Sequence, residues 1–318
     1  MNIFSRRSFK IIVAVVLTAV LYLHIDAQSL LAIVTSAKLG YIALSVVIVF
    51  IVRLLMSERW RLILDNSGIP ITFGESVYIN LVSSSLGFLL PGGVGADIIK
   101  GQHAYKKNND LSKITTVVLL DRFIGLMTML LMVFVFSSIL LGFSLGEEKV
   151  ILQIVFLNSL VLLLVSSTSA YIFIKRGDLL KNKLKKIRVL KKLLTKLYCI
   201  LDEMVLHKSL AIKVLIISIF MQLLRGVLFY YIFKSISVSI DVFYVLAYIP
   251  VVFIAMMLPF SIGGIGVRES ALFVLFQQFS LSLEQSISSG ILFYSTQIFM
   301  ILPGLLLYAF VPQPQGKR

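Results

Sequence analysis

Six long apolar segments constrain the fold of this chain more than any other feature of its sequence. They span residues 11–25, 39–56, 114–143, 150–174, 214–233 and 286–311. A transmembrane helix needs about 20 apolar residues to cross the roughly 30 Å hydrocarbon core of a bilayer. Only 14% of the 318 residues are charged, against about 25% in soluble domains. The chain therefore has too few polar residues to cover the surface of a water-soluble globule. We therefore predict an all-α polytopic membrane protein with six crossing helices.

Two further apolar stretches, 77–90 and 242–258, each end in a glycine-rich break that contains a proline. The first break reads LPGGVGAD over residues 90–97, and the second reads LPFSIGGIGVRE over residues 258–269. In both, Leu-Pro is followed by Gly-x-Gly and then by an acidic residue, and the glycine pairs are 171 residues apart. A long repeat with matched helix breaks points to an inverted-repeat transporter. We predict that both stretches form re-entrant broken hairpins, inverted with respect to each other.

The two breaks are candidate substrate-binding elements. Proline and paired glycines free backbone groups that lipid cannot satisfy, so the breaks must be buried in protein or line a wet cavity. Helix N-termini released there expose N–H groups that suit an anion such as a phosphate. The predicted translocation-site residues in the breaks are Pro91, Gly93, Gly95, Pro259, Gly264 and Gly266. The alternative is that the breaks are ordinary kinks or tight packing positions.

Lysine and arginine residues predict the orientation of the spans, because cytoplasmic loops carry an excess of them. With a cytoplasmic N-terminus, six crossings and two re-entrant hairpins, 24 of these residues lie inside and 3 outside. Both termini are then cytoplasmic, in a cell (inner) membrane. The first hairpin enters from the cytoplasm and the second from outside. We predict one integral membrane domain over 1–318, with repeat halves at about 39–143 and 209–311.

A basic segment at about 175–208 separates the two predicted halves. Between residues 180 and 201, apolar residues recur at helical spacing and basic residues occupy the opposite face. Such a helix can lie on an anionic cytoplasmic leaflet, where each basic residue contributes about 1 kcal/mol. The alternative is a solvated hairpin that only enforces topology. In either case the net charge of +15 is a membrane signature, and we expect no nucleic-acid partner.

Several ionisable residues lie within or beside the apolar segments. Arg225 lies near the middle of 214–233, and a central arginine costs roughly 2.5–3.5 kcal/mol on insertion scales, so it should face the bundle interior. The candidates for headgroup phosphate contacts are Arg122, Arg225 and Arg268, and the candidates for proton coupling are Asp97, Asp121 and Glu269. The alternative is a set of structural ion pairs that locks helices together.

The remaining polar motifs indicate neither catalysis nor metal binding. Arg53, Arg59 and Arg61 surround Trp60 and are predicted to form an interfacial anchor. The single cysteine and the three scattered histidines offer no metal site. No Gly-x4-Gly-Lys-Ser/Thr loop occurs, so the chain carries no ATPase of its own. We therefore expect no metal, no cofactor and no enzymatic activity.

Three motifs resemble the lysylphosphatidylglycerol synthase transmembrane-region family, whose members are also called flippase-like domain proteins. They are PGGVGAD at 91–97, DRFIG at 121–125 and PFSIGGIGVRE at 259–269, within a resemblance that covers about residues 10–310. In bifunctional members, an integral membrane domain translocates an aminoacylated phospholipid that a separate soluble domain synthesises. Here only 312–318 follows the last apolar segment, so the resemblance implies the translocating part without aminoacyl transfer. Some stand-alone members are associated with glycolipid or polyprenyl-linked sugar pathways.

These observations predict a lipid flippase for an anionic phospholipid or a polyprenyl-linked glycolipid. One alternative is a membrane-embedded lipid or glycosyl transferase, although the chain has no Asp-x-Asp metal motif and no sizeable loop for a nucleotide-sugar. Another is a non-transporting scaffold that holds a glycosyltransferase through the basic segment. A membrane lipid is the expected partner in the first two cases.

The charge distribution generates a testable topology. Lys106 and Lys186 should face the cytoplasm, and Glu147 and Ser237 should face outside, because the basic residues divide 24 to 3. Single-cysteine labelling in a Cys199→Ser background measures this directly. Labelling from outside at position 186 would contradict the predicted topology.

Overall fold

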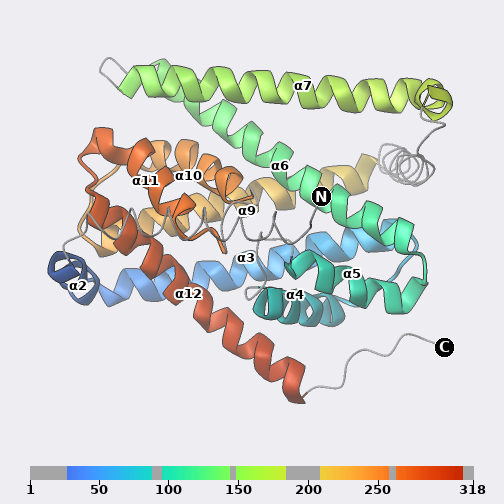
Figure 1. Ribbon diagram of the computed structural model, residues 1–318, viewed down its shortest axis with the longest axis horizontal. Coiled ribbons are helices and arrows are strands. Elements are labelled where there is room, and N and C mark those ends of the chain that lie inside the picture. Colours follow the sequence, from blue (N-terminus) through green and yellow to red (C-terminus); the bar gives the residue numbers. More distant parts are fainter. Residues whose placement is uncertain (1–26, 88–94, 144–147, 184–207, 258–262, 311–318) are drawn as a thin grey trace, which may run out of the picture.

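The computed structural model describes residues 27–87, 95–143, 148–183, 208–257 and 263–310 (Figure 1). Within these residues every regular element is a helix, which confirms the predicted all-α class. Five helices contain apolar stretches long enough to cross a membrane. They are α3 (Leu39–Asn66), α6 (Leu111–Leu141), α7 (Glu148–Lys183), α9 (Lys208–Ser235) and α12 (Leu283–Phe310). The sixth predicted crossing, 11–25, lies outside the described residues, as does most of the basic stretch 180–201.

The two glycine-rich stretches form short helices, as their breaks predict. Helices α4 (Phe73–Gly87) and α10 (Val242–Met256) have 15 residues each. At 1.5 Å per residue this is about 22 Å, which is too short to cross a hydrocarbon core of roughly 30 Å. Each is followed by a second short helix, α5 (Gly95–Asn108) or α11 (Val267–Phe276). Each pair therefore forms a helical hairpin that stops within the bundle.

The order of elements repeats along the chain. A long helix, two short helices and a second long helix occur as α3–α4–α5–α6 and again as α9–α10–α11–α12, with α7 between them. Helices α3 and α9 are antiparallel, since the Lys38 N–H at the start of α3 donates to the Ser235 carbonyl at the end of α9 over 2.9 Å. Helices α6 and α12 also run in opposite directions (Figure 1). The two sets of helices thus have the same order and opposite directions.

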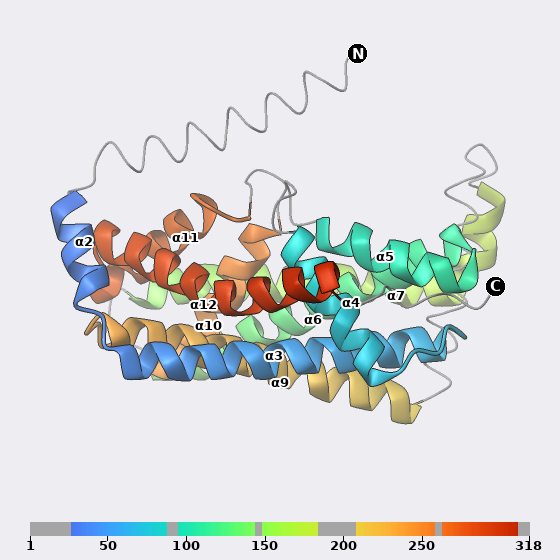
Figure 2. The same cartoon turned by 90° about the horizontal axis from the view of Figure 1, so that it is seen from below.

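The contacts between the two sets of helices show the same correspondence of α3 with α9, α4 with α10 and α6 with α12. Helix α3 packs along α9, α6 packs on α10, and α12 packs on α4 (Figure 2). Replacing each helix by its counterpart reproduces these three contacts. The larger buried apolar cluster of the described residues includes Phe229 and Phe233, which share one face of α9. Phe229 stacks on Phe293 at 5.1 Å, and Phe233 makes an edge-to-face contact with Phe276 at 5.2 Å. Aromatic packing therefore joins α9 to both α11 and α12.

Helix α3 extends ten residues beyond the predicted boundary at residue 56 and corrects the interfacial anchor. Trp60 is 1% exposed and Arg59 6% exposed, and both lie inside the protein. Arg61 instead pairs along its own helix with Glu58 and Asp65. The anchor prediction is wrong for Trp60 and Arg59, and also for Arg53, which donates to Ser84 on α4 and Gln297 on α12 inside the bundle. The end of an apolar run in the sequence is not the point where α3 leaves the bundle.

Close packing of α12 on α4 depends on Gly304. A Cβ atom at this position would lie 2.1 Å from Ser85 Oγ and 2.5 Å from the Leu81 carbonyl oxygen. Gly304→Ala should therefore lower the free energy of unfolding by about 1–3 kcal/mol, the usual cost of overpacking. The measurement is denaturant unfolding of the detergent-solubilised protein. Gly40→Ala is the control, because nothing lies within 4 Å of a Cβ at Gly40, and equal stability of both variants would contradict the tight contact.

Candidate functional site

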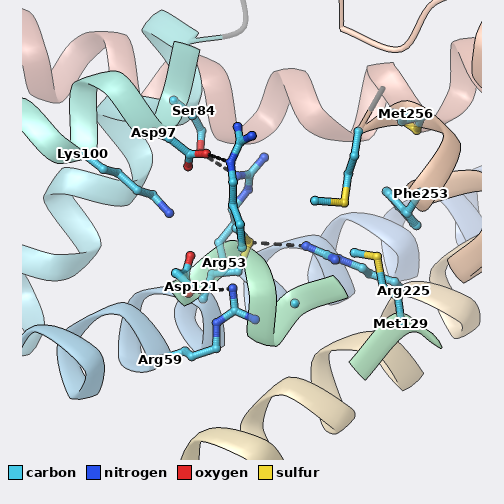
Figure 3. Close-up of a pocket in the computed structure, with 15 residues that line it drawn as sticks. Arg53, Arg59, Ser84, Asp97, Lys100, Asp121, Met129, Arg225, Phe253 and Met256 are labelled. Atoms are coloured by element: carbon cyan, nitrogen blue, oxygen red, sulfur yellow. Dashed lines mark hydrogen bonds and ion pairs between the residues drawn. The ribbon is translucent and has the colours of Figure 1, made fainter. Parts of the chain in front are cut away.

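A cavity of about 280 Å³ lies where the two hairpins approach the long helices (Figure 3). Its polar lining residues come from α3, α4, α5, α6 and α9, and its apolar lining residues come from α3, α6 and the end of α10. The charged residues that line it are Arg53, Arg59, Lys100, Arg122, Arg225, Asp97 and Asp121. The end of α10 precedes the second break and the start of α5 follows the first, so segments from both hairpins face one cavity.

Two of the lining cations are neutralised by ion pairs. The Arg59 guanidinium lies 2.8 Å from the Asp121 carboxylate, and both side chains are almost fully buried. Arg122 pairs with Asp97 through its Nε atom. These two contacts join α3 to α6 and α5 to α6. Both carboxylates of the cavity are therefore already paired with arginine.

Arg53 lies among the polar lining residues and contacts neutral groups only. Its two Nη atoms donate to Ser84 Oγ on α4 over 2.6 Å and to Gln297 Oε1 on α12 over 2.8 Å. Among the described residues, no carboxylate lies within ion-pairing distance of this guanidinium. Arg53 thus links α3 to α4 and α12 through neutral acceptors, and it has no ion-pair partner among the described residues.

Arg225 faces the interior of the bundle, as its place in the middle of an apolar segment predicts. It donates to Gln222 Oε1 over 3.3 Å, contacts Met56 Sδ at 3.8 Å and lies 5.1 Å from the centre of the Phe253 ring. A cation over an aromatic face is stabilised by about 0.5–2 kcal/mol. In the part of the chain that the structure describes, this contact and weak acceptors replace a counter-ion.

Lys100 is a further buried cation of the cavity lining. The residue is 4% exposed, and its Nζ atom lies 5.4 Å from the centre of the Trp60 ring. Across the described ranges, it makes no ion pair and no hydrogen bond. An ammonium group removed from water needs acceptors, so this side chain is ready to bind an anion.

The electrostatic balance of the cavity favours a negatively charged ligand. Five cations and two carboxylates line it, and the paired acids leave Arg53, Lys100 and Arg225 without a counter-ion among the described residues. Arginine and lysine donors bind phosphate oxygens through strong charge-assisted hydrogen bonds. The first turn of α5, which carries Asp97, also faces the cavity with the positive end of a helix dipole.

The remaining side chains of the cavity lining are mostly apolar and adaptable. They include Phe253 and four methionines, Met56, Met129, Met256 and Met257. Methionine is flexible and polarisable, and it fits irregular apolar groups. The cavity therefore offers both cations that suit an anion and apolar side chains that suit hydrocarbon.

Residues 263–269, at the end of the second break, form a separate buried cluster next to Met256. Gly264 and Gly266 have φ angles of +86° and +82°, which favour glycine. The Gly266 N–H donates to Glu269 Oε2 over 2.7 Å, and Glu269 pairs with the adjacent Arg268. A Cβ at Gly290 of α12 would clash with both side chains. This cluster fixes α11 against α12 and reaches the cavity only indirectly, since Gly264 packs on Met256.

The structure therefore divides the predicted site residues into three groups. The cavity brings together Asp97, Asp121, Arg122 and Arg225. Gly264, Gly266, Arg268 and Glu269 form the cluster of the second break. Gly95 begins α5, one residue from the cavity-lining Ala96, and Pro91, Gly93 and Pro259 lie outside the described residues.

Among the charged residues of the cavity, sequence reasoning missed three, namely Arg53, Arg59 and Lys100. Arg53 falls inside the apolar segment 39–56, which is the same signal that identified Arg225. Lys100 follows Asp97 by three residues and so shares its helix face. Arg59 has no comparable signal, because it lies beyond the apolar segment and its partner Asp121 is 62 residues away in the sequence.

Comparisons with known proteins agree with the membrane fold. The family model described as Lysylphosphatidylglycerol synthase TM region matches residues 8–304, nearly the whole chain. A search of curated proteins gave no match.

Removing one partner of the buried pair of Arg59 and Asp121 should be strongly destabilising, whereas replacing both partners by apolar residues should not. Asp121→Ala leaves an uncompensated buried guanidinium and should cost about 3–5 kcal/mol of unfolding free energy, whereas Arg59→Met with Asp121→Leu should recover most of this loss. Denaturant unfolding in detergent measures both. Glu58→Ala is the control, since its partly exposed pair with Arg61 should change stability by less than about 1 kcal/mol. A loss in Asp121→Ala no larger than in this control would contradict the assignment.

Proposed function

This chain belongs to the lysylphosphatidylglycerol synthase TM region family, and we propose that it binds the anionic headgroup of a membrane lipid in the charged cavity and translocates that lipid across the bilayer. The single observation that carries the proposal is the set of three cations, Arg53, Lys100 and Arg225, that line the cavity without a counter-ion in the described part. Ionisable side chains within membrane segments are costly to bury, so cations that have no protein counter-ion indicate a functional site.

A phosphate group matches this set of donors. Its oxygens can accept hydrogen bonds from two guanidinium groups and one ammonium group at once. A phosphate would also supply the negative charge that the cavity lacks. The substrate class that fits is a phospholipid or a polyprenyl-phosphate-linked sugar, because each joins a phosphate to hydrocarbon and the cavity offers both cations and apolar side chains.

The arrangement of helices supports translocation. The two sets of helices have the same order and opposite directions, and hairpins from both sets face the cavity. Transporters built from inverted repeats bind their substrates near such interrupted helices, and rocking of one set against the other exposes the site to either side. In this proposal the protein resides in the inner membrane with both termini in the cytoplasm.

The pairing of the acids supports a translocase over a transferase. A transferase needs a free general base within reach of the reacting group, and both carboxylates that line the cavity are ion-paired with arginine. The scaffold alternative does not require a charged cavity inside the bundle. Binding followed by movement of the lipid therefore accounts for more of the observed site than either alternative.

Removing a cation from the cavity tests the proposal. Lys100→Gln and Arg225→Ala should each slow the transfer of fluorescent phosphatidylglycerol between leaflets of proteoliposomes by about tenfold or more, since a hydrogen bond to a charged group contributes about 1.5–3 kcal/mol. Loss of the charge eases insertion, so the amount of inserted protein should not fall. Dithionite quenching measures the transfer rate.

Two further variants sharpen this test. Arg225→Lys should restore little activity if the guanidinium makes a bidentate phosphate contact, because lysine has no planar fork. Lys149→Gln is the matched control, since Lys149 is exposed on α7 and does not line the cavity. A wild-type rate in both Lys100→Gln and Arg225→Ala would refute the proposed function.

A further inference from the structure

A second, mainly apolar pocket lies beside the charged cavity. This groove of about 470 Å³ runs between α5 and α6, and its apolar lining consists of Ile98, Tyr105, Leu111, Ile114, Val118 and Leu119. No step of the proposed headgroup binding requires it. Its walls are two helices that meet at the loop between Asn108 and Leu111.

The groove opens toward the outside of the bundle. Ile98 on α5 is 51% exposed and Leu119 on α6 is 40% exposed. Apolar side chains on the outer surface of a transmembrane helix contact lipid tails, which satisfy them as well as protein does. On α6, which is a candidate membrane span, this exposed apolar surface would face the hydrocarbon of the bilayer.

The groove and the charged cavity share one wall. Asp97 and Arg122 line both pockets, and they form an ion pair with each other. The side chains of this pair are 20% and 33% exposed, whereas those of the Arg59–Asp121 pair are 11% exposed or less. The Asp97–Arg122 ion pair thus forms the polar boundary between the two pockets, and it is the more exposed of the two ion pairs that line the cavity.

From this continuity we infer that the groove between α5 and α6 holds a hydrocarbon chain of the same lipid whose phosphate occupies the cavity. The inference rests on the proposed function and adds the place where the lipid enters. The headgroup lies among Arg53, Lys100 and Arg225, the chain lies along Ile98 and Leu119, and the junction between them passes the Asp97–Arg122 pair. Arg122 is placed to donate to oxygen atoms at that junction.

The single tryptophan provides a direct signal for the experiment. Trp60 is the only tryptophan of the chain, and its ring lies under Lys100 Nζ. Its fluorescence in the detergent-solubilised full chain therefore reports an anion at Lys100. Two probes separate a lipid from a free phosphate, namely dioctanoyl phosphatidylglycerol, which has chains, and glycerol 1-phosphate, which has none.

Filling the groove should weaken only the probe with chains. Gly101 lines the groove, and a Cβ there meets Ile114 and Val118 at ordinary contact distances, so Gly101→Phe directs its ring into the groove. We expect at least a tenfold loss of affinity for dioctanoyl phosphatidylglycerol and a change below twofold for glycerol 1-phosphate. Thr115→Phe fills the groove from α6 with the same expected result. Gly74→Phe is the control, since nothing lies within 4 Å of a Cβ at that position.

Failure of this inference differs from failure of the proposed function. If both groove variants bind dioctanoyl phosphatidylglycerol within twofold of wild type while Lys100→Gln weakens it, the groove does not hold the chain and the headgroup site stands. Equal wild-type affinity for the two probes would also overturn the groove, because chains would then contribute nothing. If Lys100→Gln weakens neither probe, the proposed function itself fails.

Discussion

A positive charge inside a membrane protein must face other protein or a ligand, and this requirement organises the bundle. Arg53 and Arg59 on α3, Arg122 on α6 and Arg225 on α9 all turn toward one cavity. Turning these faces inward fixes the rotation of three long helices about their axes. The apolar residues on their other faces, such as Val47 and Phe220, then point outward, where lipid can cover them.

The interrupted hairpins make such a cavity possible. Helices α4 and α10 are too short to cross, so each ends inside the bundle and leaves space that a continuous helix would fill. Contacts between the sets then keep this space from collapsing, since α12 packs on α4 and α6 packs on α10. Small residues such as Gly304 allow these helices to approach closely.

Much of this arrangement follows from the sequence, because hydropathy sets helix length and matched glycine–proline breaks mark the hairpins. A charge within an apolar segment likewise predicted that Arg225 faces inward. The sequence does not reveal, however, how deeply a residue beyond an apolar segment is buried or toward which neighbour its side chain turns. Arg59 and Trp60 follow the apolar part of α3 and resemble an interfacial pair, yet tertiary packing buries them. Arg268 is predicted to contact the headgroup, but it stacks on Tyr294 of α12 at 4.1 Å and lies outside the cavity lining.

The hydrogen bonds of Arg53 give the cavity a mechanical connection to the packing of the helices around it. One guanidinium holds a serine on α4 and a glutamine on α12, and those two helices also meet where Ser85 Oγ donates to the Ile301 carbonyl over 2.9 Å. An anion that recruits Arg53 competes with these acceptors. Binding of an anion in the cavity and packing of α12 against α4 are then thermodynamically coupled. By thermodynamic reciprocity, the factor by which a bound anion weakens that helix contact equals the factor by which the formed contact weakens binding of the anion.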